Sequence, residues 1–129
     1  MQPTEDAEEK NILIIATSGP STPHRCAPPF YLASVLTSME HTVNMFFTME
    51  GVKLMERGIP EHFSAMPGGQ NIMGFIRAAK MAGVNMYVCK AALPGYGVSE
   101  DRLLPEINGI ASAGDLARMI TSCDQLLSL

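Results

Sequence analysis

Short apolar runs alternate along this chain with stretches that have helical spacing. The run 11–16 is almost continuously hydrophobic, whereas 42–47 and 84–89 combine β-branched and aromatic residues. Such runs are typical of strands in a parallel sheet that is covered on both faces. Two further runs, 107–111 and 124–129, predict a weaker fourth strand and a final fifth strand.

Helical patterns occupy the intervals between these runs. An apolar stripe begins after Pro28 and Pro29 and ends near Met39, and proline fits the first turn of a helix because its missing N–H is not needed there. The other expected helices are 50–57, 70–82 before Gly83, a turn within 98–104, and a segment that opens with a Ser112/Asp115 capping box and runs through Thr121.

Strands joined by helices predict an α/β fold. Parallel pairing through right-handed crossovers gives a three-layer sandwich, with a flavodoxin-like, mostly parallel five-stranded sheet and helices on both faces. In a flavodoxin-like order the first and third strands are neighbours where ligands bind, so the loops after 11–16 and 84–89 are expected to adjoin. No repeat or linker interrupts the chain, which we divide into an acidic, flexible N-terminus at 1–10 and a single domain at 11–129.

Composition limits the class of protein, the ligands and the cellular location that this domain can have. The 129 residues are 47% hydrophobic and 17% charged, which suits a compact globule. A net charge of −4 with scattered lysines and arginines excludes the basic face that nucleic acid requires. The chain shows neither a signal peptide pattern nor the roughly 20 apolar residues that cross a membrane. Three widely spaced cysteines do not form a disulfide framework, so we expect a reducing, cytoplasmic location.

Cys89 is the strongest candidate for chemistry. It closes the third predicted strand and is followed by Lys90 and a Gly/Pro-rich loop. A thiol there is held by the sheet and opens onto the edge where α/β proteins build their sites. A neighbouring ammonium favours the thiolate, which is the nucleophile. The alternative is that Cys89 is a small apolar core residue, since free cysteine is among the most buried types.

The other two cysteines differ in their expected surroundings. Cys26 is predicted at the amino end of the first helix, where the helix dipole and Arg25 favour an anion. It would share a crevice with Cys89, although it could instead be packed under the loop. Cys123 lies between the last helix and the last strand, at the opposite edge of the sheet, where a structural role is expected.

Three further chemistries fit the sequence less well. A zinc site from His24, Cys26 and Cys89 lacks the usual CxxC or HxxxH spacing. A flavin phosphate loop after the first strand would lack N–H donors, because prolines occupy several of its positions. A Ser-His-Asp hydrolase would need a G-x-S-x-G elbow, which is missing. We therefore expect neither a metal nor a cofactor.

The segments 46–52 and 84–89, with the helix between them, resemble the DsrE/DsrF family. The apolar first strand and the ending from 107 to 129 extend the resemblance over nearly the whole chain. It implies a small cytoplasmic α/β protein, commonly a homotrimer or homohexamer, that relays sulfur. In sulfur-carrying members a cysteine after the corresponding strand holds a persulfide, and that position matches Cys89. Cys26 is not part of the general family pattern.

The resemblance therefore implies a sulfur carrier or sulfurtransferase that accepts and passes on sulfane sulfur as a Cys89 persulfide. Its partners would be sulfur donors and acceptors such as a TusA-like carrier, together with a heterodisulfide-reductase-like complex. Lys90 would stabilise the anion, with Cys26 and Arg25 as auxiliary residues. Some family members lack the cysteine, so the alternative is a non-catalytic oligomeric scaffold or binding subunit.

Overall fold

The five expected strands form one parallel sheet. A computed structural model describes residues 8–129, and residues 1–7 of the expected N-terminal segment lie outside the described part. The sheet has the order β4-β3-β2-β1-β5, and every neighbouring pair is parallel. The strands are β1 (Asn11–Ala16), β2 (Thr42–Phe47), β3 (Asn85–Cys89), β4 (Gly109–Ala111) and β5 (Gln125–Ser128).

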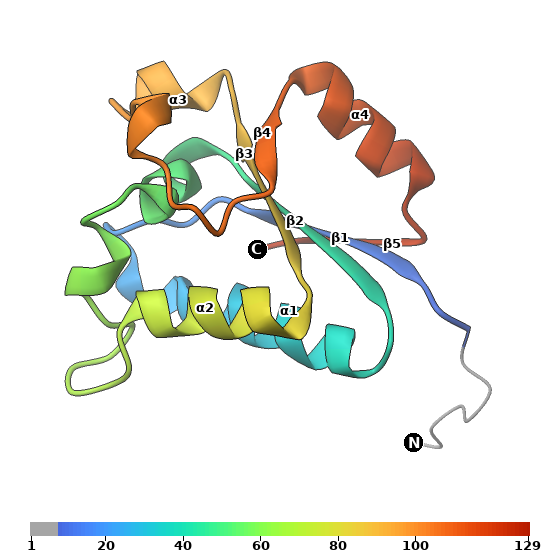
Figure 1. The fold of residues 1–129 in the computed structure, drawn as a ribbon, viewed down its shortest axis with the longest axis horizontal. Coiled ribbons are helices and arrows are strands. Elements are labelled where there is room, and N and C mark those ends of the chain that lie inside the picture. Colours follow the sequence, from blue (N-terminus) through green and yellow to red (C-terminus); the bar gives the residue numbers. More distant parts are fainter. Residues whose placement is uncertain (1–7) are drawn as a thin grey trace.

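Helices cover both faces of this sheet, which confirms the predicted α/β fold class (Figure 1). The α1 and α2 helices pack side by side on one face, and α4 crosses the other. The α-helices are α1 (Ala27–Ser38), α2 (Ile72–Ala82), α3 (Ala92–Gly95) and α4 (Ala113–Ser122). Four 3-10 helices lie in the connections: η1 (Pro23–Arg25), η2 (Met49–Met55), η3 (Pro60–His62) and η4 (Glu100–Arg102).

The strand order corrects one expectation. β2 lies between β1 and β3, so the loops after these two strands are not neighbours as a flavodoxin-like order predicts. Two interstrand spacings separate β1 from β3 by about 10 Å. The chain adds β2, β3 and β4 one after another on one side of β1, and only the connection through α4 returns to place β5 on the other side. The same pattern of strands and helices is compatible with both orders.

The main core lies between the sheet and the α1/α2 layer. Phe47 of β2 stacks on Phe30 of α1 with ring centroids 5.5 Å apart. Buried methionines such as Met45 and Met86 fill the layer between the rings and the aliphatic side chains. The opposite face has a smaller core around Leu13, Phe46 and Ala111, and α4 has no fully buried residue.

Asparagine side chains tie the strands together on the α4 side of the sheet, near the amino ends of the strands. Asn44 donates to Asn11 at 3.3 Å, Asn85 donates to Asn44 at 3.0 Å, and Asn108 donates to Asn85 at 3.4 Å. This row of amides spans four chain segments and opposes a slip of one strand past the next. It therefore helps to fix which residues of neighbouring strands lie side by side at the carboxyl edge.

Candidate functional site

Cys89 is the last residue of β3 and lies at the carboxyl edge of the sheet, as expected. Val88 is fully buried in the core under α1 and α2, so the alternation of a strand turns Cys89 toward the α4 side. There Cys89 packs against the small core, with further contact to the main core, and remains half-buried. Its neighbour across the β3–β4 pair is Ala111, and the Lys90 N–H donates to the Ala111 carbonyl at 3.0 Å. The thiol is thus held by backbone pairing and still accessible.

The amino end of α4 lies beside this thiol. Ala111 is paired with Cys89, and α4 begins only two residues after Ala111. Ser112 caps the helix in a capping box, in which the Asp115 carboxylate accepts from the Ser112 N–H at 2.8 Å and from the Ser112 hydroxyl at 2.9 Å. These bonds to Ser112 and a bond from Arg118 lower the pKa of Asp115. A helix amino end favours a nearby anion.

Two helix amino ends lie near cysteines, and only one of these neighbourhoods was predicted. Cys26 is the N-cap of α1, as expected, and the capping box at Ser112 is confirmed, but the position of the α4 amino end beside Cys89 was not predicted. The sequence indicates this terminus through the Ser112/Asp115 capping box and the weak strand predicted directly before it. Its position beside Cys89 depends on the β3–β4 register, which local sequence does not specify.

Lys90 and Arg25 are exposed residues at two separate places on the carboxyl edge. Lys90 follows Cys89 directly and leaves its side chain in solvent. Arg25 ends the η1 helix in the loop after β1, with β2 between that loop and β3. Lys90 therefore adjoins Cys89 along the chain with its side chain in solvent, and β2 separates the loop of Arg25 from β3.

Cys26 is the N-cap residue of α1, as predicted, and it is packed under the loop after β1, which was the alternative to a reactive thiol. Its side chain is 1% exposed, and its thiol donates to the Gly19 carbonyl at 3.2 Å. Burial, with a smaller contribution from the Glu50 carboxylate, raises the pKa of Cys26 from 9.0 to about 11. A thiol that donates to a carbonyl in the core must keep its proton. The prediction that the α1 terminus favours an anion at Cys26 is therefore wrong.

Cys26 lies at the end of the loop after β1, which is hydrogen-bonded to, and closely packed against, the segment after β2. The Glu50 carboxylate accepts from the Ser21 N–H at 3.0 Å and from the Ser21 hydroxyl at 2.5 Å. A Cβ atom built on Gly19 would lie 2.5 Å from the Glu50 carbonyl oxygen. One on Gly51 would lie 2.5 Å from the carbonyl oxygen of Ala16. Glycine at both positions lets these two loops pack directly on each other.

The raised pKa of Cys26 predicts a pH dependence of stability. Between about pH 9 and pH 11 the folded chain keeps a proton that the unfolded chain has lost. The free energy of unfolding should therefore fall as pH rises through this window, and urea denaturation at several pH values measures the fall. A Cys26→Ala variant, which has no thiol to ionise, should show a smaller fall. An equal fall in both proteins would contradict this account of Cys26.

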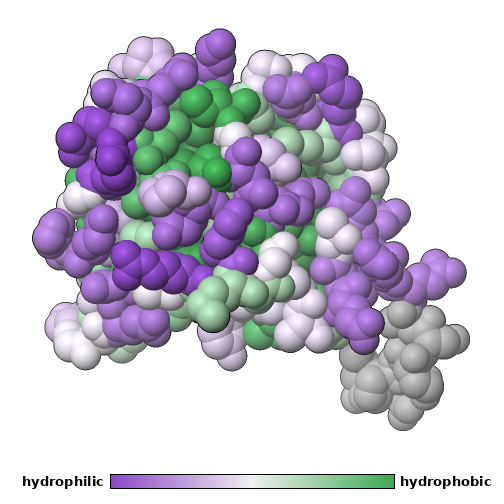
Figure 2. Space-filling view, viewed as in Figure 1, coloured by the Kyte–Doolittle hydropathy of each residue, from purple (hydrophilic) through white to green (hydrophobic). Residues whose placement is uncertain are grey.

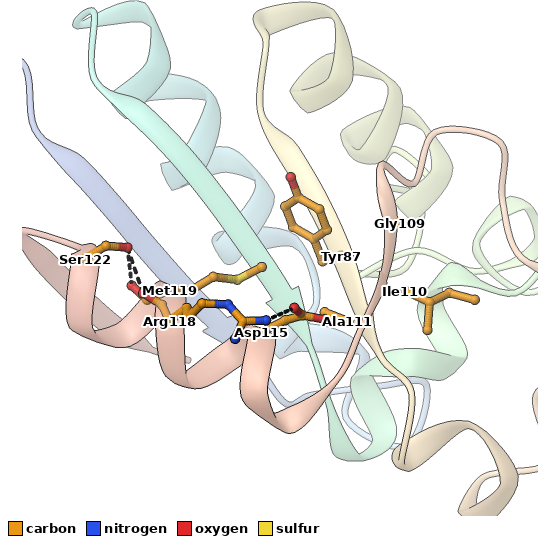
Figure 3. A pocket seen from close by; sticks show the side chains of 8 residues that line it. All are labelled: Tyr87, Gly109, Ile110, Ala111, Asp115, Arg118, Met119 and Ser122. Carbon is orange, nitrogen blue, oxygen red and sulfur yellow. Dashed lines mark hydrogen bonds and ion pairs between the residues drawn. The ribbon is translucent and has the colours of Figure 1, made fainter.

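A cavity of about 420 Å³ extends along the α4 side of the sheet (Figure 3), and its lining includes Ala111, the partner of Cys89 across the β3–β4 pair. Tyr87 lies two residues before Cys89 on the same face of β3, and the Met119 side chain extends toward it from α4. Arg118 and Asp115 form an ion pair on the α4 wall, with the Arg118 and Asp115 side chains 2.5 Å apart. Figure 2 shows apolar side chains among polar ones near α3 and the end of β3. The cavity is thus of mixed polarity and is connected to Cys89 through Tyr87 and Ala111, which line it, whereas Cys89 does not.

Residues 8–129 contain neither a metal-binding cluster nor a membrane-spanning helix. This part of the chain contains no group of three or more histidine, cysteine or acidic side chains placed to hold a metal ion. His24, Cys26 and Cys89 are not brought together. No helix in the same range is long and apolar enough to cross a membrane.

The chain belongs to the DsrE/DsrF-like family, whose model matches residues 10–129. Members of this family are generally linked to sulfur relay. No curated protein is significantly similar in sequence. This result leaves the function of this chain to be argued from its site.

Solved structures share the fold. The YchN protein from E. coli is 24% identical, with a TM-score of 0.78 and coverage of 93% of this chain and 99% of that one. MTH1491 from Methanobacterium thermoautotrophicum, a protein of unknown function, is 16% identical, with a TM-score of 0.63 and coverage of 95% and 100%. BT1422 from Bacteroides thetaiotaomicron, also of unknown function, is 13% identical, with a TM-score of 0.66 and coverage of 93% and 95%.

Proposed function

We propose that this protein is a sulfur carrier that accepts and passes on sulfane sulfur as a persulfide on Cys89. The observation that carries the proposal is the position of this thiol. It is half-buried at the carboxyl end of β3, beside Lys90 and the amino end of α4. Family membership, with its general link to sulfur relay, supports the same chemistry.

The transfer is an exchange between sulfur atoms. The Cys89 thiolate attacks the outer sulfur of a donor persulfide, R–S–SH, and forms a new S–S bond while the donor S–S bond breaks. The electron pair of the broken bond leaves with the donor as R–S⁻, and the product is Cys89–S–SH. An acceptor thiolate then attacks the outer sulfur in the same way and releases the Cys89 thiolate. The sequence of steps is redox-neutral and needs neither a metal nor a cofactor.

The surroundings of Cys89 suit these steps. A helix amino end favours a nearby anion, and α4 begins beside Cys89; in this proposal the exposed Lys90 ammonium turns toward the anions that attack and leave. The adjacent cavity leaves space on the thiol side of the sheet for part of a donor or acceptor. Cys26 is buried and protonated, so we assign it a structural role in the loop packing rather than an auxiliary role in transfer.

We further propose a homotrimer or homohexamer in the cytoplasm, with a TusA-like carrier and a heterodisulfide-reductase-like complex as exchange partners. Exposed apolar side chains support the oligomer: α4 has no fully buried residue, and Ile110 of β4, Ile120 of α4 and Leu126 of β5 are between 37% and 42% exposed. The alternative is an oligomeric scaffold in which Cys89 is incidental. The accessible position of Cys89 favours the carrier.

Treatment with polysulfide tests the proposal. The folded protein should gain one or more sulfur atoms, of about 32 Da each, which dithiothreitol removes. Intact-protein mass spectrometry counts the added atoms, and peptide mapping should place them on the peptide that contains Cys89. An unmodified mass after exposure would exclude the carrier and leave the scaffold.

A further inference from the structure

We propose that Thr48 is a positioning residue for this chemistry, and that its hydroxyl donates a hydrogen bond to the Cys89 thiolate. The inference rests on the proposed function, which it deepens by naming a second side chain that stabilises the reactive anion. It follows from the register of β2 and β3, the face that each side chain takes, and the bonds that fix the Thr48 backbone.

The register of β2 and β3, extended by one residue beyond its last pair, places Thr48 beside Cys89. Phe47 of β2 is paired with Val88 of β3. Thr48 follows Phe47, and Cys89 follows Val88. The backbone of Thr48 continues the strand, with φ −137° and ψ 174°, and its N–H donates to the Ala16 carbonyl at 3.1 Å. Adjacent positions on paired strands lie about 5 Å apart.

The two side chains also share a face of the sheet. Phe47 stacks on Phe30 in the core under α1, and Val88 is fully buried in that same core. Because successive side chains of a strand alternate between faces, Thr48 and Cys89 both turn to the α4 side. Thr48 and Cys89 therefore occupy neighbouring positions on this face across the strand pair.

The hydroxyl of Thr48 is available for this role. It makes no hydrogen bond within residues 8–129, whereas the Thr17 hydroxyl, at the equivalent place after β1, donates to the Leu129 carbonyl at 3.1 Å. A hydroxyl rotates freely about its C–O bond, so it can turn its proton toward an anion. The outer sulfur of a persulfide lies about 2 Å beyond Sγ and extends the reach of the acceptor.

Backbone bonds hold Thr48 in place. The Thr48 carbonyl accepts from the Gly51 N–H at 2.9 Å, while its own N–H is bonded to Ala16. The close approach of Gly51 to the Ala16 carbonyl fixes the loop that follows. A donor held on a rigid element stabilises a charge without having to reorganise. This feature is accessible only from the structure, because the sequence alone does not give the β2–β3 register.

Alkylation of Cys89 by iodoacetamide near neutral pH tests the inference, with peptide mapping to follow this cysteine alone. Thr48→Val keeps the shape and removes the hydroxyl. Loss of one hydrogen bond to a charged group lowers the fraction of Cys89 present as thiolate by about tenfold. The remaining thiolate is a stronger nucleophile because it is less stabilised, and this gain offsets about half of the loss on a logarithmic scale. We therefore expect alkylation to slow by about threefold, and polysulfide loading to slow similarly.

Two variants separate this role from simple packing. Thr48→Ser restores the hydroxyl and should restore the wild-type rate, whereas Thr17→Val removes a matched hydroxyl two strands away and should leave the rate unchanged. Equal alkylation rates in wild type and Thr48→Val, or a slow Thr48→Ser, would overturn the inference. Alkylation needs no persulfide, so failure of loading in all variants would contradict the carrier function separately from the role of Thr48.

Discussion

Replacing Cys89 by serine is expected to abolish sulfur loading completely. A serine hydroxyl stays protonated near neutral pH and is no nucleophile toward sulfane sulfur, so neither attack nor a persulfide is possible. Serine is close to cysteine in size, and position 89 is only half-buried at a strand end, so the fold should be retained. After polysulfide treatment, the intact mass of Cys89→Ser should show no dithiothreitol-sensitive sulfur.

Cys123→Ser is the matched control for this variant. Cys123 is also partly exposed, but it caps α4 at the opposite edge of the sheet, where its thiol donates to the Ile120 carbonyl at 3.2 Å. Loading of Cys123→Ser should equal that of the wild type. Full loading of Cys89→Ser would show that another cysteine carries the sulfur, and the assignment to Cys89 would then be wrong.

Gly51→Ala is expected to destabilise the protein strongly. The added methyl group would lie 2.5 Å from the carbonyl oxygen of Ala16, and both groups belong to tightly paired backbone. The η2 helix must move away from the end of β1, and such overpacking costs about 1–3 kcal/mol. Thermal denaturation should show a melting temperature lower by about 3–12 °C.

Gly95→Ala is the control for the glycine substitution. A Cβ atom at Gly95 would meet nothing within 4 Å, and this residue lies in the short α3 helix. Replacement there should be neutral or stabilising by up to about 1 kcal/mol, because alanine restricts the unfolded chain. A melting temperature of Gly51→Ala within the range of Gly95→Ala would contradict the close packing of the two loops.

Local patterns in the sequence predicted most elements of the fold. The expected strands 11–16 and 42–47 are confirmed as β1 and β2, and the capping box at Ser112 is confirmed as the start of α4. Hydrophobic periodicity and capping preferences depend on residues a few positions apart, so they can be recognised without tertiary information. The family resemblance is confirmed as well.

The strand order and the surroundings of the thiols depend on distant residues. The prediction that β1 and β3 are neighbours was wrong. The flavodoxin-like order and the observed order have the same succession of strands and helices along the chain, so the sequence pattern does not distinguish them. The burial of Cys26 depends on Glu50 and on the approach of the loop after β2. The prediction of an anion at Cys26 therefore failed for the same reason that the positions of Thr48 and of the α4 amino end beside Cys89 were missed. That Cys89 carries sulfur stays a prediction.

Release of sulfur from the loaded protein tests the central claim most directly. The protein is loaded with polysulfide, separated from the excess and treated with cyanide, which attacks the outer sulfur of Cys89–S–S⁻ to give thiocyanate and the Cys89 thiolate. We expect about one thiocyanate for each persulfide counted beforehand by mass, with the peptide that contains Cys89 returning to its unmodified mass. A loaded chain that forms no thiocyanate, or that loses sulfur from Cys26 or Cys123 instead, would contradict the account.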